Sequence, residues 1–357
     1  MGDCVARLIG GKYELHEVAG KGGMATVWRA SLVGHRGFRR PVAVKHMHEH
    51  LAERKEFVDM FVEEARVGAD MSAANVARTY DFVEQDGEYY LIMEWVDGID
   101  LGSYVHYVRD IGMRTRWELV VAVGIGMLRG LTAAHERQTA AGNLSPVVHR
   151  DMSPHNVLLT RKGMVKVIDF GLCLAYDRQG NDWTEPGVLK GKMSYLAPEI
   201  VAGEAPSPAT DQFAVGSVLW EALVGRKLFD GPTDVDVFKR LRTCQVQPLK
   251  PQRPDVPSKL VTVLNRALSP TPDKRFPTCR EMARHLGLVL KTVKARNDLH
   301  LLLGASVDRA MQNYVPGERT ESSAVSETPI RDIEAVVPTG KRGKRTGRLM
   351  ALFGRRR

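Results

Sequence analysis

This sequence has few cysteines, and it lacks a long apolar run and an apolar leader. The four cysteines, at positions 4, 173, 244 and 279, lack the paired spacing of metal knuckles and redox dithiols. Scattered thiols of this kind fit a reducing compartment, so we expect a cytoplasmic location. The first residues lack the apolar core of a signal peptide, and Ala6 stands where N-myristoylation requires Ser or Thr.

A membrane-spanning stretch is also missing. The longest uncharged apolar run, Leu119 to Leu128, has ten residues, whereas a helix needs about twenty to cross a bilayer. We therefore expect a buried helix there. Apolar residues make up 43% and charged residues 26% of the 357, which is typical of a soluble globular protein. This length suits two domains or one bilobal domain with a tail.

Acidic residues are absent from the last twenty positions, 338–357, which hold eight Lys or Arg. These eight account for most of the net charge of +9, because 43 basic residues face 42 acidic ones in the rest of the chain. The basic clusters flank Leu349 to Phe353 and would suit weak contact with an anionic membrane surface or nucleic acid. We favour a solvated, disordered end over either contact.

One stretch organises the chain. Residues 149–156 read HRDMSPHN, and an expected strand, Met164 to Ile168, leads from them to Asp169-Phe170-Gly171. Phosphoryl transfer requires a protein chiefly to hold Mg²⁺, phosphates and an acceptor hydroxyl in line. In this pattern Asp151 would accept or orient the hydroxyl proton. Asn156 and Asp169 would supply the oxygen ligands that Mg²⁺ prefers.

Each of these motifs is weak alone, but their order is specific. Together with Ala197-Pro198-Glu199 they strongly resemble the protein kinase family over about residues 10–290. The resemblance implies an α+β, bilobal protein kinase-like fold, with a small β-rich N-lobe that carries helix C, a larger α-helical C-lobe and a disordered C-terminal tail. The expected divisions are a lead-in (1–12), the kinase domain (13–290, with its N-lobe at 13–96 and its C-lobe at 97–290), a helical extension (291–316) and the tail (317–357).

The N-terminal part predicts a nucleotide site. Residues 19–27 read AGKGGMATV, a hairpin turn in which the glycines at 20 and 22 would let backbone N–H groups approach phosphate oxygens. Ala25 replaces the third glycine of the usual pattern. The loop looks most like that of bacterial eukaryotic-like (Hanks-type) serine/threonine kinases. Through the resemblance, the residues expected to line ATP are Ala19, Gly20, Lys21, Gly22, Gly23, Met24, Ala25, Thr26, Val27, Ala43, Lys45, Met93, Glu94 and Val96.

Within that set, Val42 to Lys45 predicts an apolar strand that ends in one lysine. A buried lysine needs anionic partners, which in the family are the α- and β-phosphates and a helix glutamate. Glu63 and Glu64 both lie in the helical pattern of residues 52–71, and the family pattern selects Glu64. We therefore expect Lys45, Glu64 and Asp151 to be catalytic residues. Met93 would lie beside the adenine, and the backbones of Glu94 and Val96 would bind it.

Two positions depart from the family pattern. Ser153 stands where serine/threonine kinases usually carry Lys, and Lys192 follows Gly191 where they usually carry Thr. We hypothesise that Lys192 compensates for the missing lysine; the other interpretation is a weakened enzyme. In the family these two residues usually distinguish serine/threonine acceptors from tyrosine acceptors. The sequence therefore leaves tyrosine open as the acceptor residue.

Regulation is expected in the segment 172–198. Thr184 is the one Ser or Thr between residues 171 and 193, and in the family an arginine placed like Arg150 binds a phosphorylated residue of this segment. Structural roles are implied for three further residues. Asp211 would hold the catalytic-loop backbone or cap a helix, and Glu199 would pair with Arg275.

The implied activity is transfer of the ATP γ-phosphate to Ser or Thr hydroxyls of protein substrates, with ATP and Mg²⁺ in the cleft. The alternative is a pseudokinase, a nucleotide-binding scaffold that transfers nothing. Ser153 and Lys192 favour it weakly, while the complete set of Lys45, Asp151, Asn156 and Asp169 opposes it. A small-molecule phosphotransferase is disfavoured, because the Ala-Pro-Glu block belongs to a peptide-docking shelf in the family.

Overall fold

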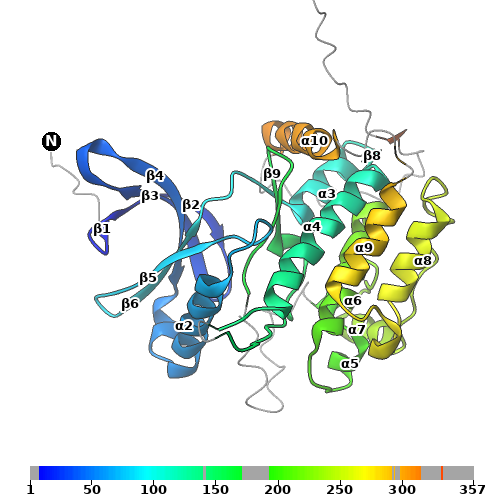
Figure 1. Ribbon diagram of the computed structural model, residues 1–357, viewed down its shortest axis with the longest axis horizontal. Helices are drawn as coiled ribbons and strands as arrows, with labels where there is room; N and C mark the ends of the chain where they lie inside the picture. Colours follow the sequence, from blue (N-terminus) through cyan, green and yellow to red (C-terminus); the bar gives the residue numbers. More distant parts are fainter. Residues whose placement is uncertain are drawn as a thin grey trace, which may run out of the picture.

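The computed structural model describes residues 8–139, 142–170, 193–291, 293, 298–314 and 331–332. They form a small lobe built around a sheet and a larger lobe built from helices, which lie side by side in Figure 1. A single connector, residues 95–97, joins the last strand of the small lobe to the first strand of the large one. The predicted bilobal α+β fold is confirmed.

Six antiparallel strands form the sheet of the small lobe, in the order β1-β2-β3-β4-β6-β5. Val42 and Val44 are 1% and 0% exposed and face the apolar layer on one side of the sheet. Because side chains alternate along a strand, Ala43 and Lys45 face the opposite side. The strands are β1 (Leu8–Ile9), β2 (Tyr13–Lys21), β3 (Ala25–Val33), β4 (Arg39–Met47), β5 (Thr79–Gln85) and β6 (Glu88–Glu94).

Two short segments differ from the sequence-based expectation. The helix expected over 52–71 begins at Lys55, as α2 (Lys55–Asp70), because Arg54 before it is extended, with φ −103° and ψ 107°. Ala52 instead ends a separate short helix, α1 (Glu49–Ala52). The alternating pattern of residues 75–83 predicts a strand, but β5 begins at Thr79 and not at Asn75, because the residues before Thr79 bind the large lobe instead. Asn75 Nδ2 donates to the Val165 carbonyl at 2.8 Å, and Ala77 N donates to the Val167 carbonyl at 3.0 Å.

The large lobe is organised around two apolar helices, α4 and α6. Within the described residues, α4 is the one helix that is long and apolar enough to cross a membrane, but 61% of that apolar stretch is buried inside the protein. It contains the apolar run that the sequence assigned to a buried helix. The helices are α3 (Leu101–Asp110), α4 (Trp117–His135), α5 (Pro198–Val201), α6 (Pro208–Val224), α7 (Asp234–Arg242), α8 (Ser258–Ala267) and α9 (Cys279–Leu290).

A second, three-stranded sheet lies between the connector and the catalytic loop. Its order is β10-β9-β7, and all its pairs are antiparallel. The strand β7 follows the connector directly. The strands β9 and β10 lie between Asn156 and Asp169 and connect these two residues. The strands are β7 (Gly98–Asp100), β9 (Val157–Thr160) and β10 (Val165–Val167), and the one-turn 3₁₀ helices of this lobe are Pro154–Asn156, Met193–Tyr195 and Pro272–Lys274.

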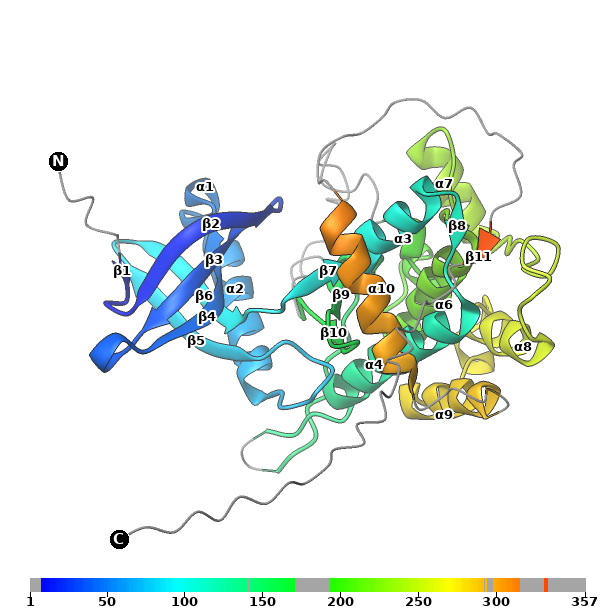
Figure 2. The same cartoon turned by 90° about the horizontal axis from the view of Figure 1, so that it is seen from above.

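The expected helical extension contains α10 (Leu299–Asn313), which crosses the large lobe beside α3 and β9 in Figures 1 and 2. Two residues of the predicted disordered tail, Arg331–Asp332, form β11, which pairs in parallel with β8 (Met113–Arg114). Backbone pairing to a strand edge in the large lobe thus gives this pair a regular structure. The rest of the tail, with its basic clusters, lies outside the described residues.

Candidate active site

Lys45 lies at the centre of a buried charge cluster. Its Nζ is 2.7 Å from Glu64 Oε1 on α2 and 2.8 Å from Asp169 Oδ1, which follows β10. The side chains of Lys45 and Glu64 are only 6% and 4% exposed. Glu63, the other candidate, has a side chain that is 40% exposed and lies 3.7 Å from Arg66. The face that α2 turns to the sheet therefore brings Glu64, and not Glu63, to Lys45.

The two buried partners differ in how readily they carry charge. Burial alone would lower the pKa of Lys45, but Asp169 and Glu64 more than offset this and raise the pKa above its ordinary value. Burial raises the pKa of Glu64 to about 7, although Lys45 opposes the shift. Glu64 Oε2 is buried without a hydrogen-bond partner in the described part of the chain. If Lys45 were removed, we therefore expect the Glu64 carboxylate to take up a proton.

The predicted catalytic loop is held in an unusual backbone conformation. Arg150 and Asp169 have φ values of 65° and 61°, in the left-handed region that side chains larger than glycine rarely adopt. Strained residues of this kind persist where surrounding contacts determine them, and they are concentrated at functional sites. The Asp151 carboxylate accepts a hydrogen bond from Asn156 Nδ2 at 3.0 Å, which fixes two of the predicted site residues relative to each other.

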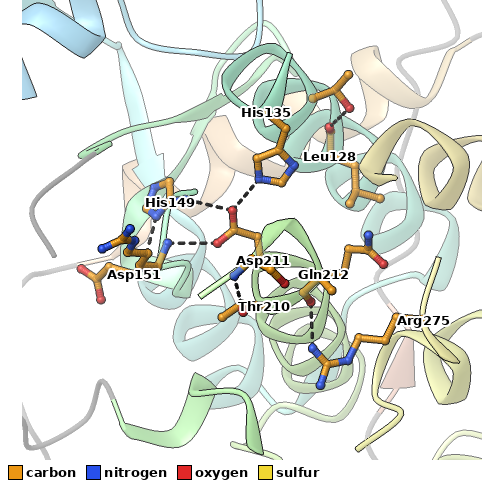
Figure 3. Close-up of polar contacts among 12 residues, drawn as sticks. Leu128, His135, His149, Asp151, Thr210, Asp211, Gln212 and Arg275 are labelled. Carbon is orange, nitrogen blue, oxygen red and sulfur yellow. Dashed lines mark hydrogen bonds and ion pairs between the residues drawn. The ribbon is translucent and has the colours of Figure 1, made fainter. Parts of the chain in front are cut away.

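Asp211, in the first turn of α6, binds the backbone of this loop (Figure 3). Its two carboxylate oxygens accept the backbone N–H groups of His149 at 2.9 Å and Arg150 at 3.0 Å. Asp211 is only 1% exposed, and these two backbone hydrogen bonds to its carboxylate stabilise the left-handed conformation of Arg150. The structure places Asp211 where the sequence predicted, against the loop backbone.

His135 is a site residue that the sequence analysis missed. Its Nε2 lies 2.7 Å from Asp211 Oδ2, and it is the last residue of α4. No motif marks it in the sequence, because it is the last residue of a helix that was identified as part of the core. Figure 3 shows it on the far side of Asp211 from His149. His149 is fully buried and its Nε2 lies 2.9 Å from the Ile168 carbonyl, next to Asp169.

The glycine-rich loop connects β2 and β3 of the small lobe. The residues predicted to line ATP lie at the end of β2 (19–21), in the turn (22–24), at the start of β3 (25–27), on β4 (43 and 45), on β6 (93 and 94) and in the connector (96). Val27 pairs with Lys45 across β3 and β4. His48 Nε2 lies 2.9 Å from the Gly22 carbonyl, and His48 N donates to the Met24 carbonyl at 3.0 Å. His48 therefore tethers the turn, a contact that the sequence did not predict.

The strand β6 carries the residues expected beside the adenine. Met93 pairs with Ala43 of β4, so it lies two residue pairs along the sheet from the pair formed by Lys45 and Leu91. Glu94 Oε2 accepts Lys166 Nζ of β10 at 2.8 Å, which joins the strand before the connector to the large lobe. Val96 lies in the connector itself. The adenine contacts expected of Met93, Glu94 and Val96 stay predictions.

The predicted structural pair is formed deep in the large lobe. Arg275 Nη1 and Nη2 lie 2.6 Å and 2.7 Å from the two carboxylate oxygens of Glu199, so the pair is bidentate. The Arg275 side chain is 0% exposed and that of Glu199 4%. The Thr210 hydroxyl also donates to Glu199 at 3.1 Å. This network fixes the Ala-Pro-Glu block to the beginning of α6.

Several predicted residues lie outside the described part of the chain: Gly171, Cys173, Thr184, Gly191 and Lys192. The compensation of Ser153 by Lys192 and the phosphorylation of Thr184 therefore stay predictions. Ser153 is described and is 4% exposed. Arg150 is partly buried, and its backbone N–H binds Asp211.

The residues present fit the Mg²⁺ that the sequence implies. Asn156 Nδ2 donates to the Asp151 carbonyl at 2.7 Å as well as to its carboxylate, so the amide oxygen is turned away from Asp151. Ile168 N donates to the Asn156 carbonyl at 3.1 Å, which brings Asp169 next to Asn156. An amide oxygen beside a carboxylate is a donor set that suits Mg²⁺, which is usually bound through few protein groups together with substrate phosphates.

A comparison with protein families identifies the family to which this fold belongs. The family described as the protein kinase domain matches residues 13–286. The chain belongs to this family. It is 37% identical over 273 residues to the tyrosine-protein kinase MasK of Myxococcus xanthus, which covers 76% of this chain and 42% of MasK. It is 29% identical over 278 residues to the serine/threonine-protein kinase PrkC of Bacillus subtilis, which covers 78% of this chain and 40% of PrkC.

Two further comparisons agree. The serine/threonine-protein kinase PknA of Mycobacterium tuberculosis is 33% identical over 274 residues, covering 75% of this chain and 59% of PknA. The crystal structure of the Mycobacterium tuberculosis PknI kinase domain aligns with a TM-score of 0.58 and 27% identity, covering 81% of this chain and 100% of that domain. The predicted resemblance to bacterial Hanks-type kinases is confirmed. The chain spans less than half the length of MasK and PrkC.

Proposed function

We propose that this chain is an ATP-dependent protein kinase that transfers the γ-phosphate to Ser or Thr hydroxyls of protein substrates. The observation that carries the proposal is the position of Lys45 Nζ, within 2.8 Å of both Glu64 and Asp169. These three groups come from three different parts of the fold, and in this family their assembly accompanies a productive arrangement of the phosphates. A nucleotide-binding pseudokinase would use the same lysine for the phosphates, so the transfer assay described below distinguishes the two functions.

In the proposed step, the acceptor hydroxyl oxygen forms a bond to the γ-phosphorus while the bond from that phosphorus to the β–γ bridging oxygen breaks. ADP leaves with that oxygen, and the hydroxyl proton passes to the Asp151 carboxylate. Asn156 orients that carboxylate through its 3.0 Å hydrogen bond. Lys45 holds the α- and β-phosphates, and Glu64 holds Lys45 in place. Mg²⁺, when bound by Asn156 and Asp169, supplies positive charge to the phosphate oxygens.

The acceptor residue is the part of the proposal that most needs a direct test, because MasK is named a tyrosine kinase whereas PrkC and PknA are named serine/threonine kinases. The experiment is incubation of the pure chain with radiolabelled ATP and Mg²⁺, followed by phosphoamino-acid analysis. We expect phosphoserine or phosphothreonine. Phosphotyrosine alone would overturn the acceptor assignment, and nucleotide binding without any transfer would favour the pseudokinase.

Lys45→Met is expected to lower kcat by about 100-fold or more, since one preorganised electrostatic group is worth roughly that much. The fold should survive, because Glu64, with its pKa raised to about 7, can be protonated once its partner is lost. The measurement is kcat with a protein substrate, together with the melting temperature. Lys259→Met, at an exposed position of α8, is the matched control. A large loss of melting temperature with normal activity per folded molecule would make Lys45 a structural residue.

Thr184 is proposed as an autophosphorylation site, since it is the one Ser or Thr between residues 171 and 193 and Arg150 precedes the catalytic Asp151. A phosphate there would add charge-assisted hydrogen bonds that order the segment. Mass spectrometry after incubation with Mg²⁺ and ATP should find it, and Thr184→Ala should lower kcat/KM. An unmodified Thr184 in a fully active chain would contradict the proposal and leave Asp182 and Glu185 as the ordering charges.

Two expectations remain predictions from the sequence. A cytoplasmic location rests on the scattered cysteines, of which Cys244 and Cys279 are free in the described part of the chain. Contact of the basic tail with an anionic surface rests on its composition.

A further inference from the structure

The helix α10 lies outside the residues matched by the kinase family, 13–286, but it packs tightly on the large lobe. Leu299, Leu303, Val307 and Ala310 are each at most 4% exposed, so α10 buries a continuous apolar stripe. Its neighbours are α3, α4, β7 and β9, and Figure 2 shows it lying across them. The Tyr104 hydroxyl of α3 lies 2.7 Å from Ser306 Oγ. This helix is therefore packed as an integral part of the large lobe.

The closest approach is to the turn between β9 and β10. A Cβ on Gly304 of α10 would lie 2.4 Å from the Arg161 carbonyl oxygen, and one on Gly163 would lie 1.8 Å from the His300 carbonyl oxygen. Glycine inside a helix costs about 1 kcal/mol relative to alanine. Gly304 is therefore explained by the close contact and not by helix formation. The helix and the turn fit together with no room for a side chain between them.

Arg161 connects this contact to the connector between the lobes. Its guanidinium forms an ion pair with Asp308 of α10, and its Nε lies 3.5 Å from Asp97 Oδ1. Its backbone N–H also donates to the Asp97 carbonyl at 3.3 Å. Asp97 follows Val96 directly and precedes β7, which pairs with β9 through Gly98 and Thr160. One side chain thus links α10 to the segment that the nucleotide would contact.

We propose that α10 is part of the nucleotide-binding machinery and acts through Arg161, a positioning residue that fixes the connector at Asp97. This inference rests on the proposed function for the identity of the ligand, an adenine nucleotide. A connector whose backbone is fixed before binding loses less freedom when the adenine is bound, which strengthens affinity. Arg161 follows β9, whereas Asn156 and Asp169 lie at the opposite end of the β9–β10 hairpin, so the proposal assigns Arg161 an effect on nucleotide affinity and not on transfer.

This role can be distinguished from a merely stabilising one. The side chains of Arg161, Asp308 and Asp97 are 39%, 43% and 65% exposed, and ion pairs at such positions add little to folding stability. Loss of the pair should therefore leave the melting temperature almost unchanged and act on the connector alone. A structural role would instead change the melting temperature and leave the affinity per folded molecule intact.

The experiment uses the full chain and measures the dissociation constant of ATP by isothermal titration, and KM for ATP against kcat. Arg161→Gln should raise the dissociation constant and KM by about threefold to tenfold, a loss typical of reduced preorganisation, while kcat at saturating ATP changes less than twofold. Arg161→Lys should recover much of the affinity. The matched control is Arg280→Gln, which removes an exposed ion pair between α9 and Glu136 at the end of α4.

The contribution of α10 is tested from its own side. Asp308→Asn should weaken ATP binding in the same direction as Arg161→Gln. The double variant should bind no more weakly than Arg161→Gln alone, because that change already removes the ion pair with Asp308. Gly304→Ala should have a similar effect, since it favours the helix but displaces it from Arg161. Its control is Ala305→Ser, on the exposed face of the same helix.

Amide hydrogen exchange of residues 94–100 in the free protein supplies a second readout that needs no nucleotide. Exchange should be faster in Arg161→Gln and Asp308→Asn than in Arg280→Gln. Equal exchange and equal ATP affinity in all three would overturn the inference, and so would an effect of Arg161→Gln that Asp308→Asn does not share. A wild-type chain that binds no ATP would overturn the proposed function, and the exchange data would then decide whether α10 fixes the connector.

Discussion

Asp151→Asn is expected to abolish phosphate transfer, with kcat lower by about 100-fold to 10,000-fold, the range typical of a general base. An amide cannot accept the hydroxyl proton at neutral pH. The fold should be retained, because the new side chain keeps an oxygen that can accept the 3.0 Å hydrogen bond from Asn156 Nδ2. Nucleotide affinity should stay near its wild-type value, since Asp151 is not among the groups expected to bind adenine or phosphate.

The measurement is kcat at saturating ATP, with the melting temperature and the ATP dissociation constant determined on the same preparations. Asp59→Asn provides the same chemical change at an exposed position of α2 and should leave all three quantities unchanged. Transfer by Asp151→Asn at the wild-type rate would refute the assignment of the base. A parallel loss of nucleotide affinity would instead mean that Asp151 organises the whole loop.

Arg275→Met is expected to cause the largest loss of stability, because it leaves the Glu199 carboxylate buried without its bidentate partner. Breaking a buried ion pair from one side costs about 3–5 kcal/mol. For a domain of this size we therefore expect the melting temperature to fall by about 10 °C. The Thr210 hydroxyl still donates to Glu199 at 3.1 Å, but one neutral hydrogen bond replaces a small part of the lost interaction.

Thermal unfolding monitored by circular dichroism measures this effect. Arg242→Met, at the exposed end of α7, should change the melting temperature little. The double variant Arg275→Met with Glu199→Met should be more stable than Arg275→Met alone, because no charge is then left buried. If the two single changes add without coupling, the pair does not act as a unit.

The family and most of the candidate site were predictable from the sequence, because their signals are local. Asp151 and Asn156 are five residues apart on one loop, and Asp169 follows a short strand, so residue type and spacing are enough to indicate phosphoryl transfer. The small-lobe strands were likewise predictable from alternating apolar residues. Their ends were less so: β5 begins at Thr79 because Asn75 and Ala77 bind the large lobe, a contact between segments about 90 residues apart.

The sequence by itself determined which chemical groups this protein has, and the tertiary structure decided which of them meet. Helical spacing alone put both Glu63 and Glu64 in reach of Lys45, and the family resemblance selected Glu64. The packing of α2 on the sheet supplies the physical reason, because it buries Glu64 and leaves Glu63 exposed. The partners of Asp211 depend on α6 and the catalytic loop meeting in space, so His135 could not be found from the chain order. The same holds for α10 and Arg161, whose ion pair joins residues 147 positions apart. Local patterns fix residue chemistry and periodicity, whereas contacts between distant segments arise only when the whole core is packed.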